Sequence, residues 1–251
     1  NHQISQPATP LTETAGIEPL DTHSLARTFL EIQDKGCENL NLVTATSHLP
    51  VILEALGLAA DSGLRLPLVY NSSGYESVAC LRLLDSVVDI YLPDMKFGDP
   101  STPGGPENLL AGATVADYVE VNREAVAEMF RQVGFLSVDY DSGRATGGLI
   151  VRHLILPARL AVTRGVLEFL SREISSEVHI SLLAQYYPAH LAAAAGTAKK
   201  YPLLARKITG EEYSEACALL EEYNFGNGWV QELESQGLYR PDFTREDPFT
   251  A

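Results

Sequence analysis

Short apolar runs alternate with longer amphipathic runs along most of the chain, and this alternation restricts the possible fold more than any other feature. The apolar runs are typical of buried strands and lie at residues 39–45, 66–74, 87–92, 148–156 and 177–186. The amphipathic runs predict helices at residues 21–36, 49–63, 75–84, 113–134, 163–175 and 209–224. A strand–helix–strand unit of about 30 residues places its two strands in one sheet as parallel neighbours. The pattern therefore predicts an α/β fold with five visible strands in an open, partial parallel β/α barrel.

The alternation runs through the chain without a second pattern, so we expect a single domain over residues 1–251. A length of 251 residues with 45% hydrophobic content suffices for one large core. Residues 1–18 are polar and lack apolar periodicity, which predicts a loosely ordered segment, and residues 236–251 are expected to form a C-terminal tail. The chain opens on Asn1 rather than Met, and we expect that its true beginning is missing.

The charge balance and the cysteines exclude some classes of partner. The chain has 18 basic and 33 acidic residues, a net charge of −15, whereas nucleic acids and anionic membranes require clustered Lys and Arg. No apolar run reaches the roughly 18 residues needed to span a bilayer. Cys37, Cys80 and Cys217 show no C-x-x-C spacing, so neither a disulfide framework nor a metal site among them is expected. This use of cysteine favours a reducing, cytoplasmic location.

The stretch "VVDIYLPDMKF" at residues 87–97 places an acid and a lysine directly after a buried strand. Every residue of 87–92 except Asp89 is apolar or aromatic, which predicts a strand in the interior of the sheet. Asp94 and Lys96 are two residues apart, so on an extended chain they point to the same side. The carboxyl ends of parallel strands open onto the ligand site of α/β folds. The alternative interpretation is a surface turn with a solvated ion pair.

Polar residues also follow the other predicted strands, and together they predict a small polar ligand with a carboxylate or an amine. They are Thr44, Thr46, Ser47 and His48 after the first strand, Asn71, Ser72, Ser73 and Gly74 after the second, Arg152 and His153 on the fourth, and Gln185 and Tyr186 after the fifth. Helix capping also accounts for Ser47 and Ser72, and His48 is more often an ordinary loop histidine. His153 should face opposite to Arg152, toward the covering helices, in a structural role. The sequence contains no phosphate-binding loop, dinucleotide fingerprint or zinc-protease motif.

Several segments in a fixed order resemble the radical S-adenosylmethionine enzymes, in an uncharacterised branch related to pyruvate formate-lyase-activating enzyme. The resemblance covers about residues 1–235 and rests on "NHQIS" (1–5), "NLVTATSHLP" (41–50), "VYNSSGY" (69–75), "VDIYLPDMKF" (88–97), "DYVEVNREAVAEMFRQVG" (117–134), "GLIVRHLILP" (148–157) and "AQYYPA" (184–189). It implies the partial β/α barrel of that superfamily, with the first strand and the cluster loop expected to be missing from this chain.

The resemblance implies a 4Fe-4S cluster and S-adenosylmethionine as cofactors. Family members hold the cluster with a Cys-x-x-x-Cys-x-x-Cys motif, which in this branch is followed almost immediately by a Gln-Asn-His-type sequence. The chain begins at Asn1-His2 and lacks the motif, so no residue here is assigned as a metal ligand. Cluster chemistry is expected only if an upstream segment supplies the cysteines.

The resemblance also implies a role for nine residues in binding the cofactor. Asn1 corresponds to an asparagine that approaches S-adenosylmethionine near the cluster, and Thr46 or Ser47 takes the place of a Gly-Gly-Glu segment that binds the methionine amine. Asn71 and Ser72 correspond to an Asp-Thr pair that helps to hold a monovalent cation, with an amide here in place of the acid. Asp94 and Lys96 correspond to an Asp-x-Lys whose lysine meets the cofactor carboxylate. Arg152 and Gln185 correspond to an arginine and a cofactor-proximal histidine on the next two strands.

Three functions from different classes follow. In the first, implied by the resemblance, reductive cleavage of S-adenosylmethionine yields a 5′-deoxyadenosyl radical that abstracts hydrogen from a substrate, such as the backbone glycine of a partner glycyl-radical enzyme. That chemistry implies an electron donor such as flavodoxin or ferredoxin. In the second, Lys96 is the nucleophile of a Schiff-base aldolase and Asp94 its proton shuttle, although a neighbouring acid would hold the lysine charged. The third is a cofactor-binding remnant without catalysis.

Overall fold

The computed structural model describes residues 21–98, 117–158, 160–188, 196, 199 and 202–234. The segment 1–18, expected to be loosely ordered, and the expected tail 236–251 lie outside these residues. The described chain divides into two compact units. One consists of residues 21–36 and 48–65, and the other contains residues 37–47 and those from 66 onward.

The first unit is a pair of helices, α1 (Thr22–Asp34) and α2 (Leu49–Asp61), which pack together. The carboxylate of Asp21 caps α1 by accepting a hydrogen bond of 2.7 Å from the Ser24 amide. Gln33 joins the ends of the two helices, because its side chain donates to the Gly63 carbonyl and accepts from the Arg65 amide. The helices predicted at residues 21–36 and 49–63 are confirmed.

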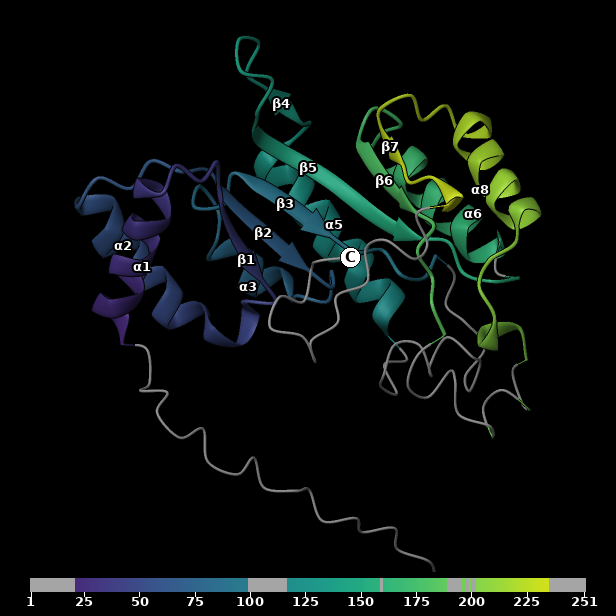
Figure 1. The fold of residues 1–251 in the computed structure, drawn as a ribbon, viewed down its shortest axis with the longest axis horizontal. Coiled ribbons are helices and arrows are strands. Elements are labelled where there is room, and N and C mark those ends of the chain that lie inside the picture. Colours follow the sequence, from purple (N-terminus) through teal and green to yellow (C-terminus); the bar gives the residue numbers. More distant parts are fainter. Residues whose placement is uncertain are drawn as a thin grey trace, which may run out of the picture. The chain divides into compact units, whose positions relative to one another are not determined.

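The second unit contains a parallel sheet with the strand order β1-β2-β3-β5-β6-β7, drawn side by side in Figure 1. The strands are β1 (Leu40–Val43), β2 (Leu68–Ser72), β3 (Ile90–Pro93), β5 (Ala145–Leu154), β6 (His179–Leu183) and β7 (Gly228–Val230). A two-residue strand, β4 (Ser137–Val138), pairs antiparallel with β5. Among the described residues, β1 and β7 each have a single neighbour, so the sheet is open there.

All five predicted strands are confirmed, and their parallel pairing is confirmed with them. The predicted number was too low, because β7 and β4 were missed. Only three residues form β7, too few for an alternating apolar pattern, and the two residues of β4 belong to a hairpin. The strand predicted at residues 87–92 lies between β2 and β5, so its interior position is confirmed.

The helices of the second unit are α3 (Val78–Arg82), α5 (Tyr118–Val133), α6 (Leu160–Phe169) and α8 (Gly210–Glu222), with shorter turns η1 (Thr46–His48), η2 (Leu170–Ile174) and η4 (Pro202–Ala205). The prediction of a helix at 163–175 was short at its start, because α6 begins at Leu160 and continues as the π-helical η2. The first residues of the helix predicted at 113–134 lie outside the described residues, and α5 confirms the rest.

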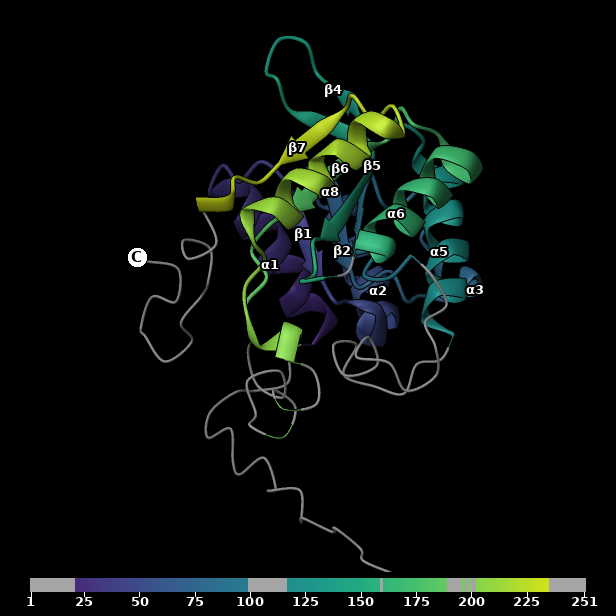
Figure 2. The ribbon, with the colours of Figure 1, turned by 90° about the vertical axis from the view of Figure 1, so that its right-hand side faces the viewer.

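Alternation along β5 separates the two faces of the sheet. Leu149, Val151 and His153 are buried, whereas Ile150 and Arg152 are partly exposed. Helix α5 packs against β3 and β5, and Figure 2 shows α3 and α6 on the same side of the strands as α5. We call this the helix-covered face, and we call the other the cavity face after the cavity that opens there at Asp94, Lys96 and Arg152. Arg152 therefore lies on the cavity face, and His153 lies among the helices.

Candidate functional site

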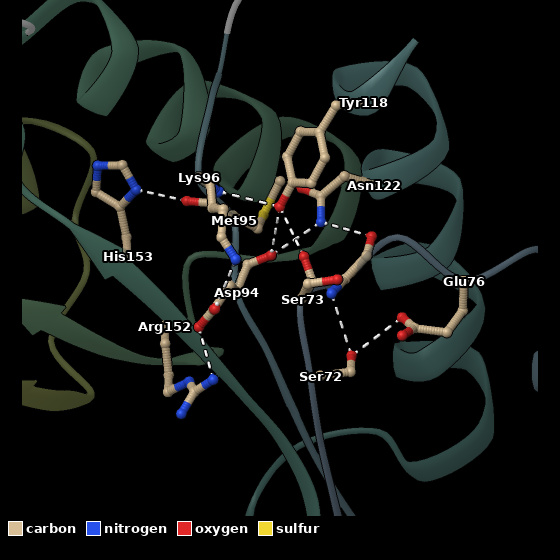
Figure 3. Close-up of polar contacts among 11 residues, drawn as sticks. Ser72, Ser73, Glu76, Asp94, Met95, Lys96, Tyr118, Asn122, Arg152 and His153 are labelled. Carbon is tan, nitrogen blue, oxygen red and sulfur yellow. Dashed lines mark hydrogen bonds and ion pairs between the residues drawn. The ribbon is translucent and has the colours of Figure 1, made fainter. Parts of the chain in front are cut away.

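A cluster of three charged side chains, shown in Figure 3, lies at the carboxyl end of β3: Asp94 and Lys96 belong to the loop after this strand, and Arg152 belongs to β5. The Asp94 carboxylate pairs with Lys96 Nζ at 3.0 Å and with Arg152 Nη2 at 2.7 Å. Asp94 and Arg152 also form a parallel backbone bridge. The side chains are 28% exposed at Asp94, 37% at Lys96 and 27% at Arg152. Two cations share one carboxylate, so the cluster has a surplus of one positive charge in a chain that is acidic overall.

A cavity of about 300 Å³ opens at this cluster, a volume at the lower end of the range for small-molecule sites. The polar and charged residues of its wall are Asp94, Lys96, Arg152 and Gln185. The remaining wall is mostly apolar and consists of Met95, Phe97, Leu154, Leu156, Leu183 and Tyr186. These residues come from the carboxyl ends of β3, β5 and β6. This lining suits a small ligand that combines an anionic group with an uncharged body.

The backbone of the Asp94–Lys96 loop is held by hydrogen bonds to both neighbouring strands, although it is not a regular strand. The Asp94 amide donates to the Ser72 carbonyl at 3.0 Å, and the Met95 amide donates to the Arg152 carbonyl at 2.8 Å. The Met95 carbonyl accepts from His153 Nδ1 at 2.7 Å. Because these bonds fix the backbone, the loop presents Asp94 and Lys96 to the cavity without needing to order itself on binding.

His153 holds the loop from the helix-covered face. Its Nε2 lies 3.0 Å from the Thr163 hydroxyl of α6, and the ring is buried. The Met95 carbonyl can only accept, so Nδ1 carries the proton and Nε2 accepts from Thr163. Burial lowers the pKa of His153, which agrees with this neutral tautomer. The prediction that His153 faces the helices, opposite to Arg152, is confirmed, and its bonds to Met95 and Thr163 support the expected structural role.

Four of the nine predicted cofactor-binding residues line the cavity, namely Asp94, Lys96, Arg152 and Gln185. The Gln185 side-chain carbonyl also accepts from Gln231 at 3.2 Å. The other predicted residues do not appear in the cavity wall: they are Thr46, Ser47, Asn71 and Ser72, while Asn1 lies outside the described residues. Asn71 pairs in register with Leu92, two residues before Asp94, so it lies on the cavity face at a neighbouring position.

Thr46 and Ser72 both hydrogen-bond to Glu76, a residue that the sequence analysis did not identify. Its carboxylate is 4% exposed and accepts from the Ser72 hydroxyl at 3.0 Å and from the Thr46 hydroxyl at 3.2 Å. The Thr46 oxygen is also 2.8 Å from the Tyr70 hydroxyl. Burial raises the pKa of Glu76, and it raises the pKa of Tyr70 to about 12. An acid that follows a polar turn, as in "SSGYES", is normally solvated, so only the fold identifies this one as buried.

Two residues of α5, Tyr118 and Asn122, also reach the loop and were missed. The Tyr118 hydroxyl lies 3.1 Å from the Asp94 carbonyl, and Asn122 Nδ2 lies 2.9 Å from the same oxygen. Both positions fit the helical periodicity of residues 113–134 as buried positions. The signal that could have found Asn122 is an amide among the apolar residues of a helix, since a buried amide needs partners.

The cysteines do not assemble a cluster site in the part of the chain that the structure describes. Cys37 precedes β1, Cys80 lies in α3 and Cys217 lies in α8, and all three are free thiols. Within the described ranges, no group of three His, Cys, Asp or Glu side chains is close enough to hold a metal ion. These thiols therefore do not fit a 4Fe-4S cluster, which needs three thiolates together. Among the described helices, none is both long and apolar enough to cross a membrane.

Comparison with known proteins gives a similarity but no activity. No protein-family model matches the chain. An uncharacterized protein of Methanocaldococcus jannaschii is 28% identical over 209 residues, which cover 82% of this chain and 52% of that protein. The chain thus spans about half the length of the curated relative that it matches.

Proposed function

We propose that the chain binds S-adenosylmethionine in the cavity after β3, as a member of the radical S-adenosylmethionine superfamily with its partial parallel β/α barrel. The observation that carries this proposal is the cluster of Asp94, Lys96 and Arg152 at the cavity wall. The branch is the one related to pyruvate formate-lyase-activating enzyme, on the sequence resemblance described above.

The charges of the cluster support a ligand carboxylate at this place. Lys96 and Arg152 provide two cations for one resident carboxylate, so one further anion would neutralise the group. Hydrogen bonds to charged groups contribute about 1.5–3 kcal/mol, more than neutral ones. S-adenosylmethionine combines a carboxylate, with its neighbouring ammonium and sulfonium groups, and an uncharged adenosine, and the cavity wall offers both charged and apolar side chains.

The iron–sulfur part of the proposal depends on thiolates other than Cys37, Cys80 and Cys217, because these three do not come together. A bound cluster would supply the electron that cleaves S-adenosylmethionine, drawn from a donor such as flavodoxin or ferredoxin, and a glycyl-radical enzyme is the proposed class of protein substrate. The residues of the described chain would bind and orient the cofactor. The Schiff-base alternative gains no support from the site, because Lys96 Nζ is engaged in an ion pair of 3.0 Å with Asp94.

Calorimetric titration with two ligands tests the proposal. S-adenosylmethionine and decarboxylated S-adenosylmethionine differ only in the carboxylate that the cluster is proposed to bind. We expect the first to bind roughly 10- to 150-fold more tightly, the equivalent of about 1.5–3 kcal/mol. Lys96→Ala should remove most of this difference, whereas the exposed Lys35→Ala should preserve it. Absence of binding, or equal affinity for the two ligands, would overturn the proposed function.

A further inference from the structure

Asn122 of α5 bonds to two strand-end loops at once. Its side chain is 0% exposed, and Nδ2 donates to the Gly74 carbonyl at 2.8 Å and to the Asp94 carbonyl at 2.9 Å. An amide nitrogen has two hydrogens, and both are used here. Asn122 Oδ1 has no hydrogen-bond partner within the described residues. The side chain therefore acts at the loops only through the two hydrogen bonds that Nδ2 donates. The loop after β2 and the loop after β3 are thereby joined through one helix position, as Figure 3 shows.

Tyr118, one helical turn earlier, bonds to the same two loops. Its hydroxyl lies 2.7 Å from the Ser73 carbonyl and 3.1 Å from the Asp94 carbonyl, and it accepts from the Lys96 amide at 3.3 Å. The ring is stacked on Tyr75 at 5.8 Å and lies edge-on to Phe97 at 5.5 Å. These ring contacts restrict the side chain, so the hydroxyl is held at the loops rather than free to turn away.

Gly74 allows the side chain of Asn122 and the Asp94 carbonyl to lie close to the backbone of the loop after β2. Its φ of +69° lies in the left-handed region that side chains rarely adopt. A Cβ at this position would meet Asn122 Nδ2 and the Asp94 carbonyl at distances that real Cβ atoms do not reach. Position 74 must therefore be glycine for Asn122 to reach the carbonyls of both loops.

We infer that Tyr118 and Asn122 are positioning residues that set the affinity of the cavity for an anionic ligand group. We call these two residues the α5 clamp. The inference rests on the proposed function, since it concerns how Asp94 and Lys96 are presented to the ligand. The clamp bonds the Asp94 carbonyl and the Lys96 amide, and these backbone groups carry the two side chains that form the ion pair. Displacement of either backbone group moves a charge that the ligand must meet.

The chemistry of the clamp depends on donors, not only on packing. Asn122→Asp keeps the shape of the side chain but places a carboxylate oxygen against two carbonyl oxygens, which have nothing to donate. A buried carbonyl without a donor costs about 1–3 kcal/mol, and the loop can avoid this cost by moving toward water. Asn122→Leu removes the same donors without burying a charge, and a merely space-filling role for Asn122 would tolerate it, so the two roles differ in outcome.

Amide hydrogen exchange of the ligand-free chain tests the clamp directly. Tyr118→Phe removes the acceptor of the Lys96 amide, and we expect that amide to exchange roughly 5-fold faster or more. Val126→Ala, at a position on the same helix that is also 0% exposed, is the matched control: it should lower overall stability without singling out residues 94–98. Unchanged exchange at Lys96 in Tyr118→Phe would overturn the inference, whatever the chain binds.

Titration with the two ligands then tests the effect on affinity. We expect Tyr118→Phe and Asn122→Asp to weaken S-adenosylmethionine roughly 5- to 150-fold and to reduce its advantage over the decarboxylated ligand. Val126→Ala should keep that advantage. If the clamp variants and Val126→Ala prefer S-adenosylmethionine over the decarboxylated ligand by the same factor, the inference is overturned while the proposed function stands. If the wild type binds neither ligand, the proposed function fails, and exchange at Lys96 still decides whether the clamp exists. Tyr118→Phe removes a single hydroxyl, so it serves if Asn122→Asp does not fold.

Discussion

Asp94 and Arg152 are joined both by a parallel backbone bridge and by a side-chain ion pair of 2.7 Å. Arg152 lies in β5 and Asp94 directly follows the neighbouring strand β3, and the two strands are separated in the chain by the whole of α5. A right-handed crossover brings such strands together in register. The register decides which residue of β5 meets the acid, because a shift by one residue would present buried His153 instead. The positive character of the cavity therefore depends on a long-range pairing.

Replacement of Lys96 should weaken S-adenosylmethionine and leave the fold intact. We expect a loss of about 1.5–3 kcal/mol in Lys96→Ala, the range for a hydrogen bond to a charged group. Lys96→Arg should rescue poorly, because a planar guanidinium does not replace a compact ammonium beside Arg152. Calorimetric titration measures both, with Lys35→Ala as the control for loss of a surface lysine. Unchanged affinity in Lys96→Ala would make this loop an ordinary solvated turn.

Asp94→Asn should weaken the same ligand less than Lys96→Ala does. The carboxylate orients Lys96 and Arg152 and contributes no donor of its own to an anionic ligand. The amide can still accept from one of the two cations, although it no longer offsets their mutual repulsion. The measurement is the same titration, repeated at low and high salt. A larger loss than in Lys96→Ala would show that Asp94 meets the ligand itself.

Amide exchange should be slowest in β3 and in residues 149–155. Both strands have neighbours on each side, and Tyr91, Leu149 and Val151 are completely buried. Opening them requires the sheet to separate, so their exchange should approach the global unfolding limit. Exchange followed by NMR or mass spectrometry checks this, with the end strand β1 as the internal comparison. Protection in β1 that equals or exceeds protection in β3 would contradict the topology.

The buried acid Glu76 should make stability depend on pH. Its folded pKa is raised, chiefly by burial, above the value of an unfolded glutamate. Its contribution is therefore fully present below the unfolded pKa of 4.5 and is lost as the pH rises through the raised pKa. Urea unfolding of wild type and Glu76→Gln between about pH 4 and 7 should show wild type losing stability relative to the variant as pH increases. A difference that is constant over this range would contradict the buried position of Glu76.

Glu212 should give the opposite dependence. Its carboxylate pairs with Arg206 and also accepts from the Thr209 and Ala158 amides, and these bonds lower its pKa to about 2. Stability from this group is present above its unfolded pKa of 4.5 and is lost as the pH falls toward 2. We expect Glu212→Gln to cost about 1–3 kcal/mol at pH 7, because a charged acceptor of several donors is removed.

The control for Glu212 lies next to it on the same helix. Glu211 is also in the first turn of α8, but it is exposed. Glu211→Gln should change stability by a few tenths of a kcal/mol at most, since only its interaction with the helix dipole is lost. Urea unfolding at pH 7 and pH 3 separates the two variants. Equal costs would mean that Glu212 acts only as another charge at the helix start.

The features that depend on local backbone geometry could be predicted from the sequence. Side chains alternate along a strand with a period of two, so the pattern alone predicts that Asp94 and Lys96 share a side and that Arg152 and His153 face opposite ways. Apolar runs long enough to show that period predict β1, β2, β3, β5 and β6, whereas the three residues of β7 are too few.

Which distant residues meet at the site could not be predicted from the sequence, because it depends on how the strands and helices pack. Nothing in the local pattern indicates that Asn122 reaches the carbonyls of Gly74 and Asp94, or that Glu76 is buried under Thr46. Helical periodicity identifies which side of α5 is buried, but the partner of each position depends on where that helix crosses the sheet. A hydrogen bond between residues far apart in the chain exists only once the strands are in register and the helix is packed on them, and for that reason the clamp and the buried acid are properties of the fold.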